Sequence, residues 1–92
     1  MMKSCCLRAF VTGKVQGVNY RRTVQKQALQ ANITGYAKNL ADGRVEVLMC
    51  GDCKKVKTLS EWLWQGPADA RVTHVECEVL TLCHTPDNFS TQ

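Results

Sequence analysis

Two patterns of apolar residues divide this sequence into six segments, and the order of these segments restricts the fold more than any other feature. Four segments alternate apolar and polar residues, as a half-buried strand does, and two repeat apolar residues every three or four positions, as an amphipathic helix does. The predicted strands are residues 5–12, 34–39, 44–50 and 72–80, and the predicted helices are residues 21–31 and 54–65. The order strand, helix, strand, strand, helix, strand is that of the split βαβ arrangement of ferredoxin-like folds. We therefore predict an α+β sandwich, an antiparallel sheet with two helices on one face and an open opposite face.

Turn signals support these boundaries. Asn19 is suited to cap the first helix, and Asn32 to end it in the left-handed conformation. The Asp42-Gly43 step favours a hairpin between the second and third strands. Gly66, with the proline after it, ends the second helix. The pattern fails only in the polar, turn-rich segment 83–92, where one phenylalanine is the obvious anchor.

The same alternation predicts which side chains are buried. In segment 72–80, Val75, Cys77 and Val79 are expected to face the core, and His74 to point outward as an ordinary surface histidine. Trp62 and Trp64 flank opposite sides of the apolar stripe on the second helix, so at least one of them should be partly exposed. For both tryptophans, packing and edge cover are preferred over a ligand role.

A loop with unusual composition lies between the first strand and the first helix. It reads Gly13-Lys14-Val15-Gln16-Gly17-Val18-Asn19-Tyr20-Arg21. The two glycines allow the backbone to curl tightly, so that the amides of residues 16–21 turn inward at the positive end of the following helix, as in a phosphate site. Arg21 adds a guanidinium that matches phosphate oxygens. The loop alone is weak evidence, since tight turns also need glycine and no Gly-Lys-Ser/Thr closes it as in a Walker loop.

The loop resembles one signature of the acylphosphatase family, a glycine-bounded Val-Gln-Gly-Val core followed by an aromatic residue and an arginine. Residues 35–39, Gly-Tyr-Ala-Lys-Asn, followed by Asp-Gly and Val-Glu-Val, resemble the second signature. The resemblance covers roughly residues 5–80. It implies hydrolysis of acyl phosphates without a cofactor, with Arg21 holding the phosphoryl group and Asn39 positioning the attacking water. The family commonly ends in a basic, aromatic strand, which segment 83–92 does not match, so a fifth strand stays an open question.

The residues themselves favour direct attack by water. Loop 13–21 contains no Cys, Ser or Asp that would accept a phosphoryl group, and no acidic cluster there offers a magnesium site. Asn39 ends a strand that should run parallel to the first, so it should emerge at the same sheet edge as the loop, where its amide could orient a water. A neutral amide deprotonates water poorly, so the leaving group must be good, and the carboxylate of an acyl phosphate departs readily.

Two alternatives stay open beside this hydrolase. The net charge of +4 suits nucleic acid as well as an anionic substrate, and an open sheet face with Phe10 could stack a base. An anion-sensing module would use the same loop without turnover. We favour the hydrolase with a small-molecule acyl phosphate substrate and no nucleic acid, because the basic residues are scattered and no aromatic stripe accompanies them.

Length and the absence of long apolar runs complete the expectations. Ninety-two residues suit a single domain spanning residues 1–92, and no run is long enough to cross a bilayer. We expect a monomer that does not bind membranes. The N-terminal segment lacks a secretory leader, which predicts a cytoplasmic protein.

The six cysteines are expected to be free thiols in that reducing compartment. Cys50-Gly51-Asp52-Cys53 has the inner spacing of a zinc knuckle but no second pair with that spacing, so no metal site is expected. Right-handed crossovers place residues 5–12 antiparallel to residues 44–50. A register that pairs Cys6 with Cys50 would set Phe10 opposite Glu46, and it would allow a disulfide as the alternative to two thiols.

Overall fold

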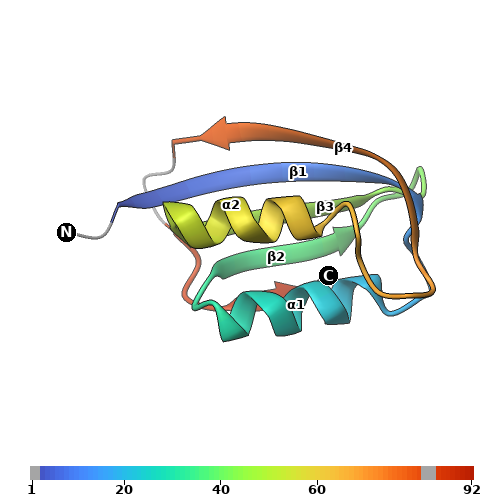
Figure 1. Ribbon diagram of the computed structural model, residues 1–92, viewed down its shortest axis with the longest axis horizontal. Helices are drawn as coiled ribbons and strands as arrows, with labels where there is room; N and C mark the ends of the chain where they lie inside the picture. The colour runs from blue at the N-terminus through green and yellow to red at the C-terminus, as the bar shows by residue number, and fades with distance from the viewer. Residues whose placement is uncertain (1–2, 82–84) are drawn as a thin grey trace.

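The computed structural model describes residues 3–81 and 85–92, which form a five-stranded sheet with two helices on one face (Figure 1). The elements are β1 (Ser4–Lys14), α1 (Tyr20–Gln30), β2 (Thr34–Asn39), β3 (Val45–Asp52), α2 (Cys53–Trp62), β4 (Arg71–Leu80) and β5 (Phe89–Thr91). The strands follow the order β4-β1-β3-β2-β5. Helix α1 packs on β2 and β5, and α2 on β1 and β3. The predicted α+β ferredoxin-like fold with an open sheet face is confirmed.

The short strand β5 settles the question of the C-terminal segment and corrects one prediction. It pairs in parallel with β2, with Phe89 opposite Gly35, so the sheet is mixed and not wholly antiparallel. Phe89 is buried in the core, which anchors this short strand at the sheet edge. The part of the polar-tail prediction that falls on Cys83 and His84 lies outside the described residues.

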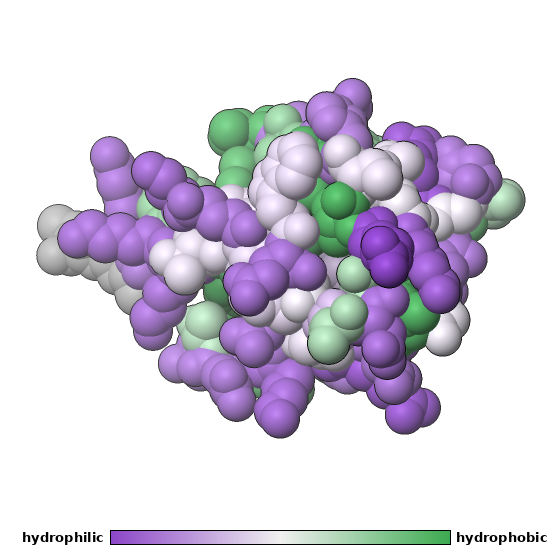
Figure 2. All heavy atoms as spheres, turned by 45° about the vertical axis from the view of Figure 1, so that its right-hand side comes forward, coloured by the Kyte–Doolittle hydropathy of each residue, from purple (hydrophilic) through white to green (hydrophobic). Residues whose placement is uncertain are grey.

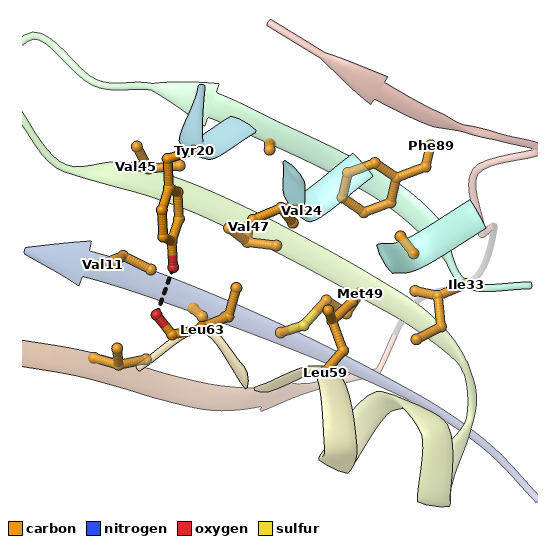
Figure 3. Close-up of a cluster of buried hydrophobic side chains, with 14 of the residues drawn as sticks. Val11, Tyr20, Val24, Ile33, Val45, Val47, Met49, Leu59, Leu63 and Phe89 are labelled. Carbon is orange, nitrogen blue, oxygen red and sulfur yellow. Dashed lines mark hydrogen bonds between the residues drawn. The ribbon is translucent and has the colours of Figure 1, made fainter. Parts of the chain in front are cut away.

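The core lies between the helices and the covered face of the sheet (Figure 3). Its fully buried large side chains come from both helices, from β1 and β3, and from the segments that adjoin these elements: Val11, Val15, Tyr20, Val24, Ile33, Val45, Val47, Met49, Val56 and Leu63. Tyr20 is the one with a polar end, and its hydroxyl donates a hydrogen bond to the main-chain oxygen of Leu63 at 2.7 Å. Burial raises the pKa of Tyr20 well above its ordinary value. The first residue of α1 is therefore anchored in the core.

The pairing of β1 with β3 follows the predicted antiparallel register. Cys6 lies opposite Cys50, and Phe10 lies opposite Glu46. Because β2 also runs antiparallel to β3, β1 and β2 point in the same direction. Their carboxyl ends therefore meet at one edge of the sheet, as the sequence predicted.

Two disulfides at the opposite end correct the expectation of free thiols. Cys6 is joined to Cys50, with Cα atoms 4.2 Å apart, and Cys5 to Cys53, with Cα atoms 4.9 Å apart. The expectation was based on a reducing compartment, but the strand register places Cys6 opposite Cys50, and Cys53, at the start of α2, lies within bonding reach of Cys5. Cys5 and Cys6 are consecutive in a strand and point to opposite faces, so the four sulfurs do not surround one metal position.

Strand β4 corrects the predicted burial of its apolar face. Val75 is buried, but Cys77 is exposed and Val79 is 79% exposed. The alternation is as predicted, but β4 is an edge strand, and α2 packs mainly on β1 and β3. Because neither helix packs extensively on β4, the apolar face of this strand is exposed at Cys77 and Val79. His74 is exposed, as expected.

The first strand and both helices differ by a few residues from the predicted segments. Strand β1 continues to Lys14 because, after a bulge, Gly13 and Lys14 still pair with β4. A Cβ on Gly13 would lie 2.0 Å from the main-chain oxygen of Arg71, so this glycine serves strand pairing and does not begin the loop. Helix α1 begins one residue earlier than predicted, at Tyr20, and ends at Gln30; Asn32 has the predicted left-handed backbone, with φ of 56°.

Helix α2 is shorter than predicted and ends at Trp62. Its N-terminus is capped by Asp52, whose carboxylate accepts a hydrogen bond from the amide of Lys55 at 3.4 Å. Residues 63–65 form a turn. Trp64, at 52% exposure, confirms that one tryptophan is partly exposed. No helix in residues 3–81 or 85–92 is long and apolar enough to cross a membrane.

Candidate active site

The loop of residues 15–19 joins the end of β1 to the start of α1, at the edge where β2 also ends. Gly17 and Asn19 have positive φ values of 75° and 60°, which produce the predicted tight curl. Asn19 is the N-cap residue of α1, as predicted, but its side chain makes no capping hydrogen bond. The left-handed backbone differs from the extended one in which a capping side chain reaches the first-turn amides. Its carbonyl oxygen instead accepts from the amide of Thr23 at 3.0 Å.

The amides of this loop are available to bind an anion. Within the described chain, those of residues 16–19 donate to no backbone acceptor, and those of the first helical turn have no partner inside the helix. They border a hollow of about 280 Å³ lined by Val15, Gly17, Asn19, Tyr20, Arg21 and Arg22. Figure 2 turns this end of the molecule forward, and hydrophilic residues surround small hydrophobic patches there. Unpaired amides, a helix N-terminus and two guanidiniums make the hollow suitable for a phosphate group.

Arg21 occupies the first turn of α1, directly after the buried Tyr20. Its Nη1 atom donates a hydrogen bond to the main-chain oxygen of Gln92 at 2.7 Å. The ring of Tyr20 stacks on Trp62, with centroids 6.4 Å apart, and this contact with the Leu63 hydrogen bond fixes the start of the helix. The guanidinium is thus held by the segment after β5, while the residue before Arg21 is anchored in the core.

Asn39 is the last residue of β2 and lies opposite Val45, which in turn lies opposite Val11 near the end of β1. The main-chain N–H of Asn39 donates to the same Gln92 oxygen at 3.1 Å. Arg21 and Asn39, predicted as a pair, therefore meet at one atom. The side-chain Oδ1 of Asn39 is buried and has no hydrogen-bond partner among the described residues. A buried carbonyl of this kind is expected to accept a hydrogen bond from a water or ligand.

The β2–β3 turn completes this edge of the molecule. Asp42 accepts hydrogen bonds from the amide of Arg44 at 3.0 Å and from its Nε at 2.7 Å, and these bonds lower the pKa of Asp42. The side chain of Gln16 reaches this turn from the loop: its Nε2 donates to the main-chain oxygens of Leu40 at 2.8 Å and Arg44 at 3.0 Å. The loop and the end of β2 are therefore joined by a side chain.

Sequence reasoning placed Gln16 in the site through its amide, and it missed the bridging side chain and the contribution of Gln92. The chain separations are 24 and 28 residues for the Gln16 bonds and 71 for the bond from Arg21 to Gln92. No local pattern encodes contacts at such separations. The predicted position of Asn39 beside the loop gave the one available signal that the β2–β3 turn would be near.

A second hollow, of about 260 Å³, lies between the helices and is lined mostly by apolar groups. Leu59 and Trp62 form its floor beside Lys54 and Lys55. It contains neither Arg21 nor Asn39 and has no curled loop of unpaired amides. Among the described residues, no group of three or more His, Cys, Asp or Glu side chains is arranged to hold a metal ion.

Comparison with known proteins gives the family. Residues 7–91 match the family model described as Acylphosphatase. The chain belongs to the acylphosphatase family. It is 60% identical over 77 residues to an acylphosphatase of Chromohalobacter salexigens, covering 84% of this chain and 86% of that protein.

Solved acylphosphatase structures have the same fold. That of Coxiella burnetii superposes with a TM-score of 0.91 at 38% identity, over 97% of this chain and 93% of that one. That of Bacillus subtilis also gives 0.91, at 31% identity, over 96% and 98%. The predicted family, fold class and enzyme class, a hydrolase of the acylphosphatase type, are thereby confirmed.

Proposed function

We propose that this acylphosphatase hydrolyses the carboxyl-phosphate bond of small acyl phosphates, giving a carboxylate and inorganic phosphate by direct attack of water. The observation that carries this mechanism is the buried Oδ1 of Asn39, which has no hydrogen-bond partner in residues 3–81 and 85–92 and lies at the strand end where Arg21 also makes its contact. An oxygen in that position accepts a hydrogen bond from a water, and this bond orients the lone pair of the water toward the bound phosphoryl group.

In this proposal the loop binds the phosphoryl group, and Asn39 at the end of β2 positions the attacking water. The amides of Gln16, Gly17, Val18, Asn19, Tyr20 and Arg21 and the guanidinium of Arg21 hold the phosphoryl oxygens, where charge spreads in the transition state. The water held by Asn39 forms a bond to phosphorus as the bond to the acyl oxygen breaks. The carboxylate leaves with the electron pair, and the proton of the water passes to a phosphoryl oxygen. No step requires a metal or cofactor.

The test is turnover of benzoyl phosphate in the presence of a chelator. The unmodified protein should turn over at the same rate with and without chelator, and Arg21→Ala and Asn39→Ala should each lower kcat/KM by at least about a hundredfold. Lys26→Ala and Lys38→Ala are the matched controls, because these exposed lysines lie on α1 and beside Asn39. Circular dichroism checks that each variant is folded.

The outcomes separate the alternatives. Retained turnover in folded Arg21→Ala or Asn39→Ala would refute the role of that residue. Phosphate binding without turnover would indicate an anion sensor. Salt-dependent RNA binding without turnover would indicate the nucleic-acid module. The last is disfavoured because guanidiniums of Arg8 and Arg44 lie 5.5 and 5.1 Å from the ring of Phe10, which a base would need to stack on.

We further propose that residues 1–92 act as a single, monomeric, cytoplasmic domain that does not bind nucleic acid or membranes. One core between one sheet and two helices supports the single domain. Sedimentation at assay concentration tests the monomer, and a mass near 20 kDa in place of 10.3 kDa would contradict it.

A further inference from the structure

The side chain of Gln16 makes the two hydrogen bonds that join loop 15–19 directly to the 40–44 turn, within the described residues. Its amide nitrogen has two hydrogens, and each is used, toward Leu40 and toward Arg44. Each acceptor already holds one hydrogen bond within the turn: the oxygen of Arg44 accepts from the amide of Leu40 at 2.8 Å, and the oxygen of Leu40 accepts from the amide of Gly43 at 3.2 Å. A carbonyl oxygen has two lone pairs, so each accepts the additional bond without losing its first.

The position of these acceptors relative to Asn39 gives the contact its significance. Leu40 directly follows Asn39, and Arg44 directly precedes Val45, the strand partner of Asn39. Gln16 therefore binds both chain segments of the turn, one directly after Asn39 and one directly before its partner Val45. The backbone of Gln16 belongs to the loop whose amides border the hollow. One side chain spans from the phosphate-binding loop to the strand end that bears the water-orienting amide.

We propose that Gln16 is a positioning residue, whose side chain sets the distance between the bound phosphoryl group and the water held by Asn39. The inference rests on the proposed function. It separates two properties of the site. The loop and Arg21 bind phosphate by themselves, whereas attack by the water also requires the correct distance between the loop and the end of β2. A misplacement of about 1 Å is enough to cost on the order of a hundredfold in rate.

The test compares Gln16→Met, which keeps length but removes both donors, with Gln25→Met. Gln25 is the matched control because its Nε2 also donates to a main-chain oxygen, that of Phe89 at 2.9 Å, and is also partly buried. Three quantities are measured for each: kcat with benzoyl phosphate, the competitive inhibition constant of inorganic phosphate, and the thermal midpoint. We expect Gln16→Met to lower kcat at least about tenfold with the inhibition constant within about threefold of the unmodified protein.

Both substitutions should lower the thermal midpoint, Gln25→Met by less because it removes one hydrogen bond and Gln16→Met removes two, and Gln25→Met should leave kcat within about twofold. A folded Gln16→Met protein with unchanged kcat, or one whose kcat and phosphate affinity fall together, overturns the inference. If Gln16→Met does not fold, Gln16→Asn provides the same test, because it keeps the amide but draws it out of reach of both acceptors. Absence of turnover in the unmodified protein would instead refute the proposed function, so the two failures are distinguishable.

Discussion

The two disulfides lead to a quantitative prediction about stability, because they connect nearly the same points of the chain. Cys5 and Cys53 are 48 residues apart, and Cys6 and Cys50 are 44 apart. In the chain-entropy model, closing a loop of either length stabilises the folded state by about 4 kcal/mol, and the two lengths differ by only about 0.1 kcal/mol. Once one bridge is present, the second closes only the small ring formed by residues 5–6, residues 50–53 and the two bridges. Closing a loop of about five residues contributes about 2 kcal/mol.

The prediction is therefore strongly non-additive. Reducing both bridges should lower the free energy of unfolding by at least about 4 kcal/mol, whereas the double variant Cys5→Ala/Cys53→Ala, kept oxidised, should lose at most about 2 kcal/mol. Cys5 and Cys53 are the suitable pair to remove, because they are only partly buried while Cys50 is buried at 2% exposure. Removing the outer pair leaves no large cavity.

Urea unfolding with and without a dithiol reductant measures these free energies, and mass spectrometry counts the bridges. Each disulfide takes up two hydrogens on reduction, so four are expected for the unmodified protein. A mass unchanged by reductant would show that the bridges are absent. A cost for Cys5→Ala/Cys53→Ala equal to that of full reduction would refute the shared-loop reasoning.

Three further predictions concern individual positions. Gly35→Ala should cost about 2–4 kcal/mol, since its Cβ would lie 1.9 Å from a main-chain oxygen of β3, whereas Gly43→Ala, with φ of 95° and open space, should cost only about 1 kcal/mol; chemical unfolding measures both, and equal costs would contradict the packing argument. Burial, with a hydrogen bond to a glutamate, raises the pKa of Tyr36 from 10.0 to about 12, so the folded state holds this proton more tightly and stability should fall as pH rises from 10 to 12. Tyr36→Phe should show a smaller fall over that range. Val75→Ala should lower the free energy of unfolding by about 2 kcal/mol, and Val79→Ala, at an exposed position, by no more than about 0.5 kcal/mol. A similar loss in both variants would mean that Val79 is buried.

Much of the fold followed from the sequence because its signals are local. Strand alternation, helical spacing and the Asp42-Gly43 turn are read within one segment, and they predicted the order of the first six elements. Burial at Val79 was mispredicted because alternation shows which face a residue occupies but not whether a helix covers it. The short β5 was left open because its one anchor, Phe89, is buried only through contacts with distant segments.

The candidate site divides in the same way. The amino-acid sequence led to the predicted chemistry, since a glycine-bounded loop, Arg21 and Asn39 are visible in it as residue types at recognisable positions. Tertiary structure alone decided that Gln92 accepts from both Arg21 and Asn39, that Gln16 bridges to the neighbouring turn, and that Cys5 and Cys6 pair with Cys53 and Cys50. Hydrogen bonds and sulfur–sulfur contacts act over a few ångströms, so they depend on where strands far apart in the chain are brought together, and only the folded register specifies that.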